Sequence, residues 1–343
     1  MALRIFGSQN SPYSVKIKSY CQYKGISHEW IIRNSDTQEE YSKYAKLPII
    51  PLVVTPKGEA MQDSTPIIEA FEARCPEPSL YPSDPTLRFL SELLEEYGDE
   101  WGNKWMFHLR WARAVDQDIV SVRLAREMMP NQPAEQAAKM IKKRMSGRGF
   151  AVGSNEKTAP IIEADLLEVL PILEKHLQTR KFLLGNRPAL ADFGLGPQLY
   201  ETLIDPTGGD WMKPYPRTCE WCMHMVDLKP PAGNDAGNFE QWEGLQSTLE
   251  PLLKHAGLFL AWSVANAEAL GAGKQEMTVD FGGKSWWQTV GGPQKYHVKS
   301  LKEIRRKYQA VASNTELRSI LERTGCLAAL QEKEKEKEKS SSR

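Results

Sequence analysis

Two serine residues near the N-terminus stand where a redox motif carries its cysteines. The stretch Ser11-Pro12-Tyr13-Ser14 has the spacing of Cys-Pro-Tyr-Cys, with a serine in place of each cysteine. An alcohol stays protonated at neutral pH without an adjacent base, and no histidine lies nearby in sequence, so this motif excludes dithiol–disulfide exchange. A hydroxyl at the start of a helix can donate a hydrogen bond to a bound thiolate, or it can cap the helix. Both interpretations of Ser11 remain open, with Ser14 as the alternative donor.

A second group of reactive side chains lies in Cys219-Glu220-Trp221-Cys222 and is followed by His224. A structural zinc site needs four ligands and usually combines two such pairs, whereas this chain has one pair. On an amphipathic helix the two cysteines share a face, so we expect buried thiols. The sequence therefore predicts no metal site.

The elements that must position the serines alternate between strand and helix. Apolar runs predict strands at 3–6, 28–33 and 51–54 and a short fourth strand, with helices at 14–23 and 65–75 and a polar helical stretch at 35–46. Ser11 then lies where the first strand gives way to the first helix. The free N–H groups and the positive dipole end of that helix favour an anion at this point.

Beyond a proline-rich segment, CPEPSLYPSDP, the pattern becomes helical. We predict helices at 86–115, 116–129, 134–145, 159–179, 190–204, 217–227 and 239–269, with Pro171 kinking or breaking its helix. Gly282-Gly283 is flanked by β-prone runs and predicts a β-hairpin. A basic helix at 297–311 follows, and the tail EKEKEKEKSSSR is low in complexity.

Composition limits the partners and the compartment. Lys plus Arg and Asp plus Glu both number 44, so we expect neither a nucleic acid nor an anionic membrane as partner. No apolar run approaches the roughly 20 residues needed to cross a bilayer. Five irregularly spaced cysteines and the lack of a signal-like N-terminus indicate a cytoplasmic protein.

Several motifs resemble those of the glutathione transferases. SPYSVK is similar to the Ser-Pro-Phe-x-x-Arg start of the serine-type, tau-like classes and to the Cys-Pro-Phe of the omega class. PIIPLVV and MQDSTPII resemble the family's segment before the third strand and its Glu-Ser-x-x-Ile motif. FLLGNRPALADFGLG and YPRTCEWCMHM resemble two helix motifs of the second domain. The motifs occur in the family's order over about residues 3–230.

The resemblance implies an α/β, thioredoxin-like N-terminal domain and an all-α C-terminal domain. We place the first, glutathione-binding domain at residues 1–80, a linker at 81–86 and the helical domain at 87–232. Residues 233–325, with the β-hairpin, form an extension beyond the usual family length, and 326–343 form a charged, disordered tail. Because large side chains gain most by burial, the tryptophans of the extension predict that it packs on the body of the protein.

The same resemblance implies a glutathione site. Ser11 would hydrogen-bond the glutathione sulfur, Pro51 would follow a cis peptide bond, and the Ile50 backbone would pair with the cysteinyl part. Further contacts are expected from Tyr13, Gln62, Asp63 and Ser64, where Ser64 can equally cap its helix. An electrophile pocket would be lined by Trp101, Trp105, His108 and Trp111, although helical spacing alone also fits core positions. Asp192 would cap its own helix.

The leading hypothesis is a glutathione transferase-like enzyme, with glutathione as co-substrate and an apolar or aromatic electrophile. A homodimer is expected from the resemblance alone. Lys16 replaces the family's arginine, Ile49 replaces a basic residue and Ala189 replaces a hydroxyl residue. These departures and the long extension favour the alternative, a non-catalytic scaffold or interaction protein. A thiol-dependent isomerase, dehalogenase or lyase is a third possibility.

Overall fold

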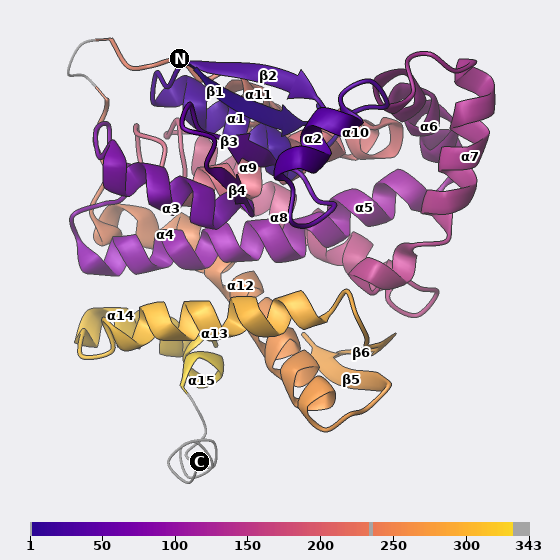
Figure 1. Ribbon diagram of the computed structural model, residues 1–343. Coiled ribbons are helices and arrows are strands. Elements are labelled where there is room, and N and C mark those ends of the chain that lie inside the picture. The colour runs from indigo at the N-terminus through magenta and orange to yellow at the C-terminus, as the bar shows by residue number, and fades with distance from the viewer. Residues whose placement is uncertain (1, 233–235, 332–343) are drawn as a thin grey trace, which may run out of the picture.

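A computed structural model of the chain describes residues 2–232 and 236–331. In Figure 1 the small sheet of the first domain lies at one side of a helical body, and the C-terminal elements lie against the opposite side. Among the described helices, none is both long and apolar enough to cross a membrane.

The first domain is a four-stranded sheet with helices packed against it. The strands are β1 (Leu3–Gly7), β2 (His28–Ile32), β3 (Leu52–Val54) and β4 (Ala60–Gln62), in the order β2-β1-β3-β4. β1 is parallel to β2 and antiparallel to β3, and β3 is antiparallel to β4. The helices are α1 (Pro12–Tyr23), α2 (Gln38–Tyr44) and α3 (Ser64–Arg74). This arrangement confirms the predicted thioredoxin-like fold.

Successive residues of a strand point to opposite faces of the sheet, and here the side chains on both faces are buried. Ile5 belongs to the main core together with Ile17 of α1 and Ile67 of α3, whereas Phe6 packs with Tyr41 of α2 on the other face. The sheet therefore fixes where β1 ends and α1 begins.

The second domain is all-α, as predicted. Its elements are α4 (Pro85–Tyr97), a π-helical turn η1 (Gly98–Gly102), α5 (Asn103–Ala112), α6 (Ala114–Met128), α7 (Ala134–Ser146), the short turn η2 (Gly149–Val152), α8 (Ala159–Leu177), α9 (Leu190–Leu203), α10 (Pro206–Met212) and α11 (Pro216–Val226). A Cβ atom on Gly98 would lie 2.6 Å from the Leu195 backbone nitrogen, so glycine allows η1 and α9 to cross closely. The helix α10 was not predicted, since its sequence contains Gly208-Gly209.

The predicted break at Pro171 does not occur, because α8 continues from Ala159 to Leu177. A proline removes one helical hydrogen bond and frees the carbonyl four residues earlier, here that of Leu167. Both Pro171 and Leu167 are exposed, so water can solvate that carbonyl.

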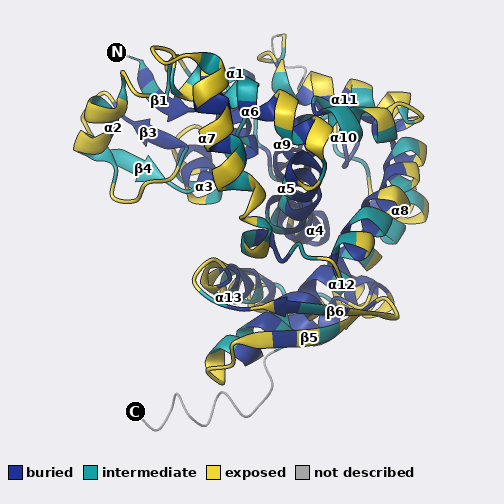
Figure 2. Cartoon of the chain, turned by 90° about the vertical axis from the view of Figure 1, so that its right-hand side faces the viewer, coloured by how far each residue is buried: buried dark blue, intermediate teal, exposed yellow. Residues whose placement is uncertain are grey.

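The extension consists of α12 (Trp242–Gly271), the hairpin β5 (Glu276–Phe281) and β6 (Lys284–Thr289), α13 (Lys295–Gln309), α14 (Thr315–Arg323) and α15 (Leu327–Leu330). The predicted hairpin is confirmed, and both turn glycines have positive φ angles, 60° at Gly282 and 79° at Gly283. Trp262 and Trp286 are fully buried, which confirms that the extension packs on the body. Figure 2 shows buried segments of α4 and α5 facing those of α12 and the hairpin.

The start predicted for the tail, residue 326, is wrong. Cys326 and Leu330 are fully buried in the main core, and Leu327–Leu330 form α15. Burial of the apolar side chains in this segment stabilises it against the core, so the ordered extension continues into residues 326–331. The EKEKEKEK segment lies outside the described residues.

Candidate functional site

A pocket of about 280 Å³ lies where the two domains and the extension meet. The first domain contributes Tyr13, Ile49, Ile50, Pro51, Asp63 and Ser64. The opposite wall consists of Asp99, Glu100, Asn103, Lys104, Ala151 and Val152. The extension closes one side with Pro293, Tyr296 and His297. A larger hollow of about 790 Å³ between α3, α4 and α13 contains none of the predicted site residues, so size alone does not identify the site.

Most of the predicted glutathione contacts lie in this pocket. The Ile50–Pro51 peptide bond is cis, as predicted, and lies just before β3. Asp63 has a positive φ of 81°, a conformation that non-glycine residues rarely adopt and that functional sites often retain. The Tyr13 hydroxyl donates a hydrogen bond of 2.9 Å to the Asp99 carbonyl, and burial raises the pKa of this phenol well above its usual value. Tyr13 is therefore a neutral group at the pocket wall.

Gln62 lies outside the pocket lining and holds the loop before the cis-proline. Its side-chain oxygen accepts hydrogen bonds from the backbone N–H groups of Lys46 and Leu47, both at 3.0 Å. Its amide nitrogen donates to the carbonyl of Ile49 at 2.9 Å. Gln62 thus holds the backbone of Ile49 and Ile50 in place without lining the pocket itself.

Ser11 is the N-cap of α1. Its hydroxyl oxygen accepts a hydrogen bond from the Ser14 backbone nitrogen at 3.4 Å, and Pro12 occupies the first helical position. Ser11 is partly buried, and it is not among the residues that line the pocket. Ser14 is fully buried, and its hydroxyl has no hydrogen-bond partner among the described residues. Ser11 thus caps the helix, whereas the Ser14 hydroxyl stays without a partner among the described residues.

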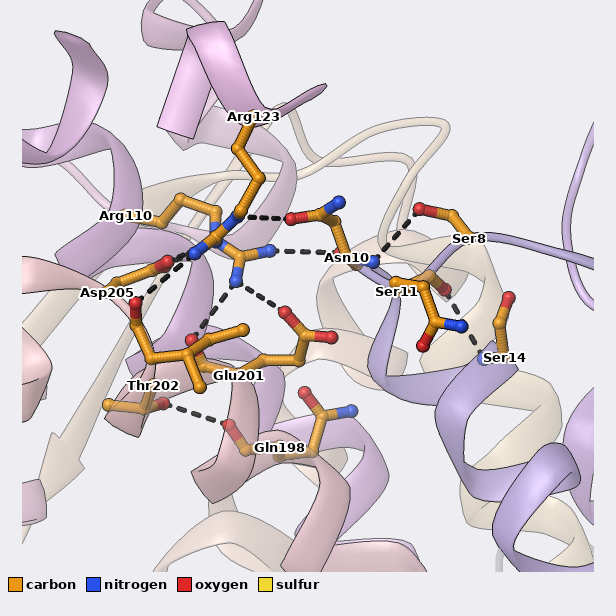
Figure 3. A network of polar contacts seen from close by, with 12 residues as sticks. Ser8, Asn10, Ser11, Ser14, Arg110, Arg123, Gln198, Glu201, Thr202 and Asp205 are labelled. Atoms are coloured by element: carbon orange, nitrogen blue, oxygen red, sulfur yellow. Dashed lines mark hydrogen bonds and ion pairs between the residues drawn. The ribbon is translucent and has the colours of Figure 1, made fainter. Parts of the chain in front are cut away.

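A buried arginine of the helical domain fixes the loop that precedes Ser11. The Arg110 guanidinium donates to the Asn10 carbonyl at 3.0 Å, and it pairs with Glu201 at 2.6 Å and with Asp205 at 2.5 Å. Arg123 also donates to the Asn10 side chain and to Asp205. Figure 3 shows this network reaching from α5 and α9 to the first turn of α1. The position of Ser11 is therefore set by both domains.

Lys16 joins the two domains beside the pocket. Its ammonium group is buried and lies 2.5 Å from Glu95 and 2.6 Å from Asp99. Burial alone would lower the pKa of Lys16, but the two carboxylates raise it overall. Burial raises the pKa of Asp99, and the neighbouring Glu95 carboxylate raises it further, whereas the Lys16 ammonium opposes both. The residue that replaces the family's arginine thus forms an ion pair between domains.

The four residues predicted for the electrophile pocket lie on other faces of their helix. Trp101 and Trp105 are fully buried, and both indole N–H groups donate to Asp165, at 2.7 and 2.8 Å. His108 lies 2.7 Å from the Ser154 hydroxyl and 3.0 Å from Glu163. Trp111 packs in a separate cluster with Val120 and Ala137. None of the four lines the pocket of about 280 Å³.

Besides Asp99, which pairs with Lys16, the residues of this helical stretch that line the pocket are Glu100, Asn103 and Lys104. Their i, i+3, i+4 spacing places them on one face, which is the signal that the sequence offered. His297 of α13 completes this wall, and its Nδ1 lies 2.9 Å from a Glu100 carboxylate oxygen. Nothing in the sequence links His297 to Glu100.

Asp192 and the two cysteines Cys219 and Cys222 lie outside the pocket. Asp192 accepts hydrogen bonds from the backbone nitrogens of Ala189 and Leu183, both at 2.9 Å, which confirms its capping role. Burial raises the pKa of its carboxyl to about 7. Cys222 is buried and Cys219 partly buried. Within residues 2–232 and 236–331, no group of three or more His, Cys, Asp or Glu side chains is arranged to hold a metal ion.

Comparisons with known proteins identify the family. Residues 5–79 match the family model of the glutathione S-transferase N-terminal domain, and residues 133–222 match that of the C-terminal domain. No curated protein matches the chain.

Solved structures with a similar fold include a glutathione S-transferase from Methylobacterium radiotolerans in complex with glutathione sulfonate, at 17% identity and a TM-score of 0.40 over 70% of this chain and 99% of that chain. The β-etherase LigF from Sphingobium sp. strain SYK-6 is 18% identical, with a TM-score of 0.49 over 73% of this chain and 99% of that one. A tau class glutathione S-transferase from mango, Mangifera indica, is 17% identical, with a TM-score of 0.40 over 72% and 96%. Because the models of both domains match in their order along the sequence, residues 5–79 and 133–222 are the N- and C-terminal domains of the glutathione S-transferase superfamily.

Proposed function

We propose that the protein is a glutathione transferase-like enzyme that forms a thioether from glutathione and an electrophile. The observation that carries this proposal is the pocket itself, in which the cis-proline, Asp63 and Ser64 of the first domain face a wall from the helical domain. Glutathione would lie along the first-domain side, with its γ-glutamyl carboxylate at the start of α3. The electrophile would lie against α5 and the extension.

The proposed chemical role of the first domain is to hold the glutathione sulfur as a thiolate. Lowering the pKa of a thiol by about two units corresponds to about 2.7 kcal/mol. One hydrogen bond from a hydroxyl to a charged sulfur is worth about 1.5 to 3 kcal/mol, so a single serine can supply much of this shift. Ser11 is the proposed donor, because its hydroxyl stands at the positive end of α1. Ser14 is the alternative, since its buried hydroxyl has no partner among the described residues.

Calorimetric titration with glutathione and an assay with chlorodinitrobenzene test this proposal. We expect binding and turnover by the wild-type protein. Ser11→Ala should retain the fold and lower kcat by about 10²-fold, as for the loss of one donor to a developing anion. The ultraviolet absorbance of the bound thiolate, followed against pH, should show a higher thiol pKa in the variant. Ser14→Ala, on the same helical turn, tests the alternative donor in the same assays.

The outcomes separate the candidate functions. An unchanged thiol pKa in Ser11→Ala with a raised one in Ser14→Ala would move the donor role to Ser14. Glutathione binding without turnover of any electrophile would support the scaffold alternative. No binding at all would overturn the enzyme proposal. We also propose a cytoplasmic homodimer, and sedimentation equilibrium of the purified chain tests the oligomeric state.

A further inference from the structure

Lys104 is a buried lysine in the wall of the pocket without an acidic partner. It is 1% exposed and lines the pocket from the first turn of α5. Its ammonium nitrogen donates to the carbonyl of Val152 at 3.1 Å and lies 3.9 Å from the centroid of the Trp262 ring. Among the described residues, no carboxylate lies within 4.0 Å of this nitrogen. Its neighbours satisfy only part of its hydrogen-bonding capacity.

Two other lysines with buried side chains each form an ion pair with a carboxylate. Lys16 pairs with Glu95 and Asp99, and Lys24 lies 2.8 Å from Glu72. Buried ammonium groups are normally paired, since an isolated charge in an apolar environment is costly. Lys104 departs from this pattern, and it does so in the wall of the pocket of about 280 Å³. Its unpaired state indicates a role toward a bound molecule.

We propose that Lys104 donates a proton to the oxygen that leaves the electrophile, so that the second substrate belongs to the class of epoxides and ethers. This inference rests on the proposed transferase function. As the glutathione sulfur attacks carbon, a carbon–sulfur bond forms and the carbon–oxygen bond breaks. The electron pair of the broken bond remains on oxygen, and the proton moves from the Lys104 nitrogen to that oxygen. An ether gives a thioether and a separate alcohol, whereas an epoxide opens to one molecule that carries both groups. In either case the lysine is left as a neutral amine that regains its proton from water.

The surroundings of Lys104 suit a proton donor at neutral pH. Burial lowers its pKa to about 7, and Glu100 of η1 opposes this shift. The other titratable group bearing on it is His297 of α13, whose own pKa is lowered by burial and which contacts the same Trp262 ring. Val152 of η2, Trp101 of η1 and Trp262 of α12 are neutral neighbours. A general acid is most effective when its pKa lies near the working pH.

The test compares two electrophiles on the same protein. Styrene oxide needs a proton on its leaving oxygen, whereas chlorodinitrobenzene releases chloride, which needs none. Both reactions require the same thiolate, so the ratio of their kcat/KM values cancels thiolate formation. In the wild-type enzyme this ratio should stay constant below about pH 7 and fall above it, as Lys104 loses its proton.

Lys104→Met keeps the apolar stem and removes the proton donor. We expect it to lower kcat/KM for styrene oxide by about 10²-fold more than kcat/KM for chlorodinitrobenzene, and the ratio of the two should no longer depend on pH. Lys104→Arg keeps the positive charge but cannot release a proton at neutral pH, so it should behave like the methionine variant. Lys157→Met is the matched control, because Lys157 also lies over a tryptophan ring, that of Trp287, but outside the pocket.

Equal losses with both electrophiles in Lys104→Met would assign Lys104 a structural role and overturn the inference. Full styrene oxide activity in Lys104→Arg would also overturn it, since charge alone would then suffice. Failure of the transferase proposal looks different, because neither electrophile would react with the wild-type protein. Circular dichroism and thermal unfolding establish that both variants fold.

Discussion

The phenol of Tyr296 donates a hydrogen bond of 2.9 Å to a carboxylate oxygen of Asp63, although the two residues are 233 positions apart in sequence. Lys299 lies 3.7 Å from the same oxygen. The extension therefore contacts the start of α3 at the rim of the pocket, and it contributes to the proposed glutathione site as well as to the electrophile side.

Tyr296→Phe should destabilise the protein by about 0.5 to 1 kcal/mol. This is less than the usual value for a hydrogen bond to a charged acceptor, because Tyr296 is 43% exposed. Urea unfolding followed by circular dichroism measures this change. Tyr215→Phe is the control, since Tyr215 is partly buried and its hydroxyl makes no hydrogen bond within residues 2–232 and 236–331. Equal effects of the two substitutions would show that the contact with Asp63 adds nothing to stability.

Lys16→Met should destabilise the fold by about 3 to 5 kcal/mol, because it leaves two buried carboxylates without a cation. The loss should appear as a lower midpoint of urea unfolding. Lys18→Met serves as the control on the same helix, since Lys18 makes no ion pair within the described residues and lies 5.1 Å from the Trp30 ring. We expect it to cost under about 1 kcal/mol. Similar losses in both variants would contradict a special role for the Lys16 cluster.

The part of the site that the sequence predicted is the part that depends on local structure. Ser11 caps α1 at the position that the strand and helix patterns indicate. Gly282-Gly283 likewise forms its hairpin turn because glycine tolerates positive φ. Each of these features is decided within a few residues of sequence. The cis bond before Pro51 is different, because it was expected from the resemblance to the family and not from the local pattern.

The electrophile side could not be predicted in the same way. The helical stretch around Trp101 is covered on several sides, by the helical domain and by the extension, so its apolar periodicity does not indicate which face borders the pocket. Trp101 stacks on Phe281 of the hairpin, with ring centroids 4.6 Å apart, and turns away from the pocket that its neighbour Glu100 lines. Such a contact depends on chain segments far apart in sequence.

Ser11→Ala should lower the stability of the protein, whereas Ser14→Ala should not. Loss of the Ser11 cap should cost about 0.5 to 1 kcal/mol, since its hydrogen bond is long at 3.4 Å. Ser14→Ala removes a buried hydroxyl that has no partner among the described residues, so the variant should be unchanged or up to about 1 kcal/mol more stable. Thermal unfolding of the two variants measures the difference. A larger loss for Ser14→Ala than for Ser11→Ala would mean that the Ser14 hydroxyl is hydrogen-bonded in solution.

The junction of α8 and α12 should lose stability in acid because it contains a buried histidine. His176 is 1% exposed and lies 2.8 Å from the Thr248 hydroxyl of α12 and 2.9 Å from the carbonyl of Leu183. Burial lowers its pKa from 6.5 to about 4. Between these values the unfolded chain binds a proton that the folded chain does not, so stability falls as the pH drops from 6.5 towards 4.

His176→Gln should remove this component, which amounts to about 3 kcal/mol between the two pKa values. Urea unfolding of wild type and variant at several pH values isolates it, because all other groups cancel in the difference between the two proteins. His224→Gln is the control: burial also lowers the pKa of His224, but this side chain is exposed, so a smaller change in slope is expected. Parallel stability curves for wild type and His176→Gln would show that His176 accepts its proton in the folded state as readily as in the unfolded chain.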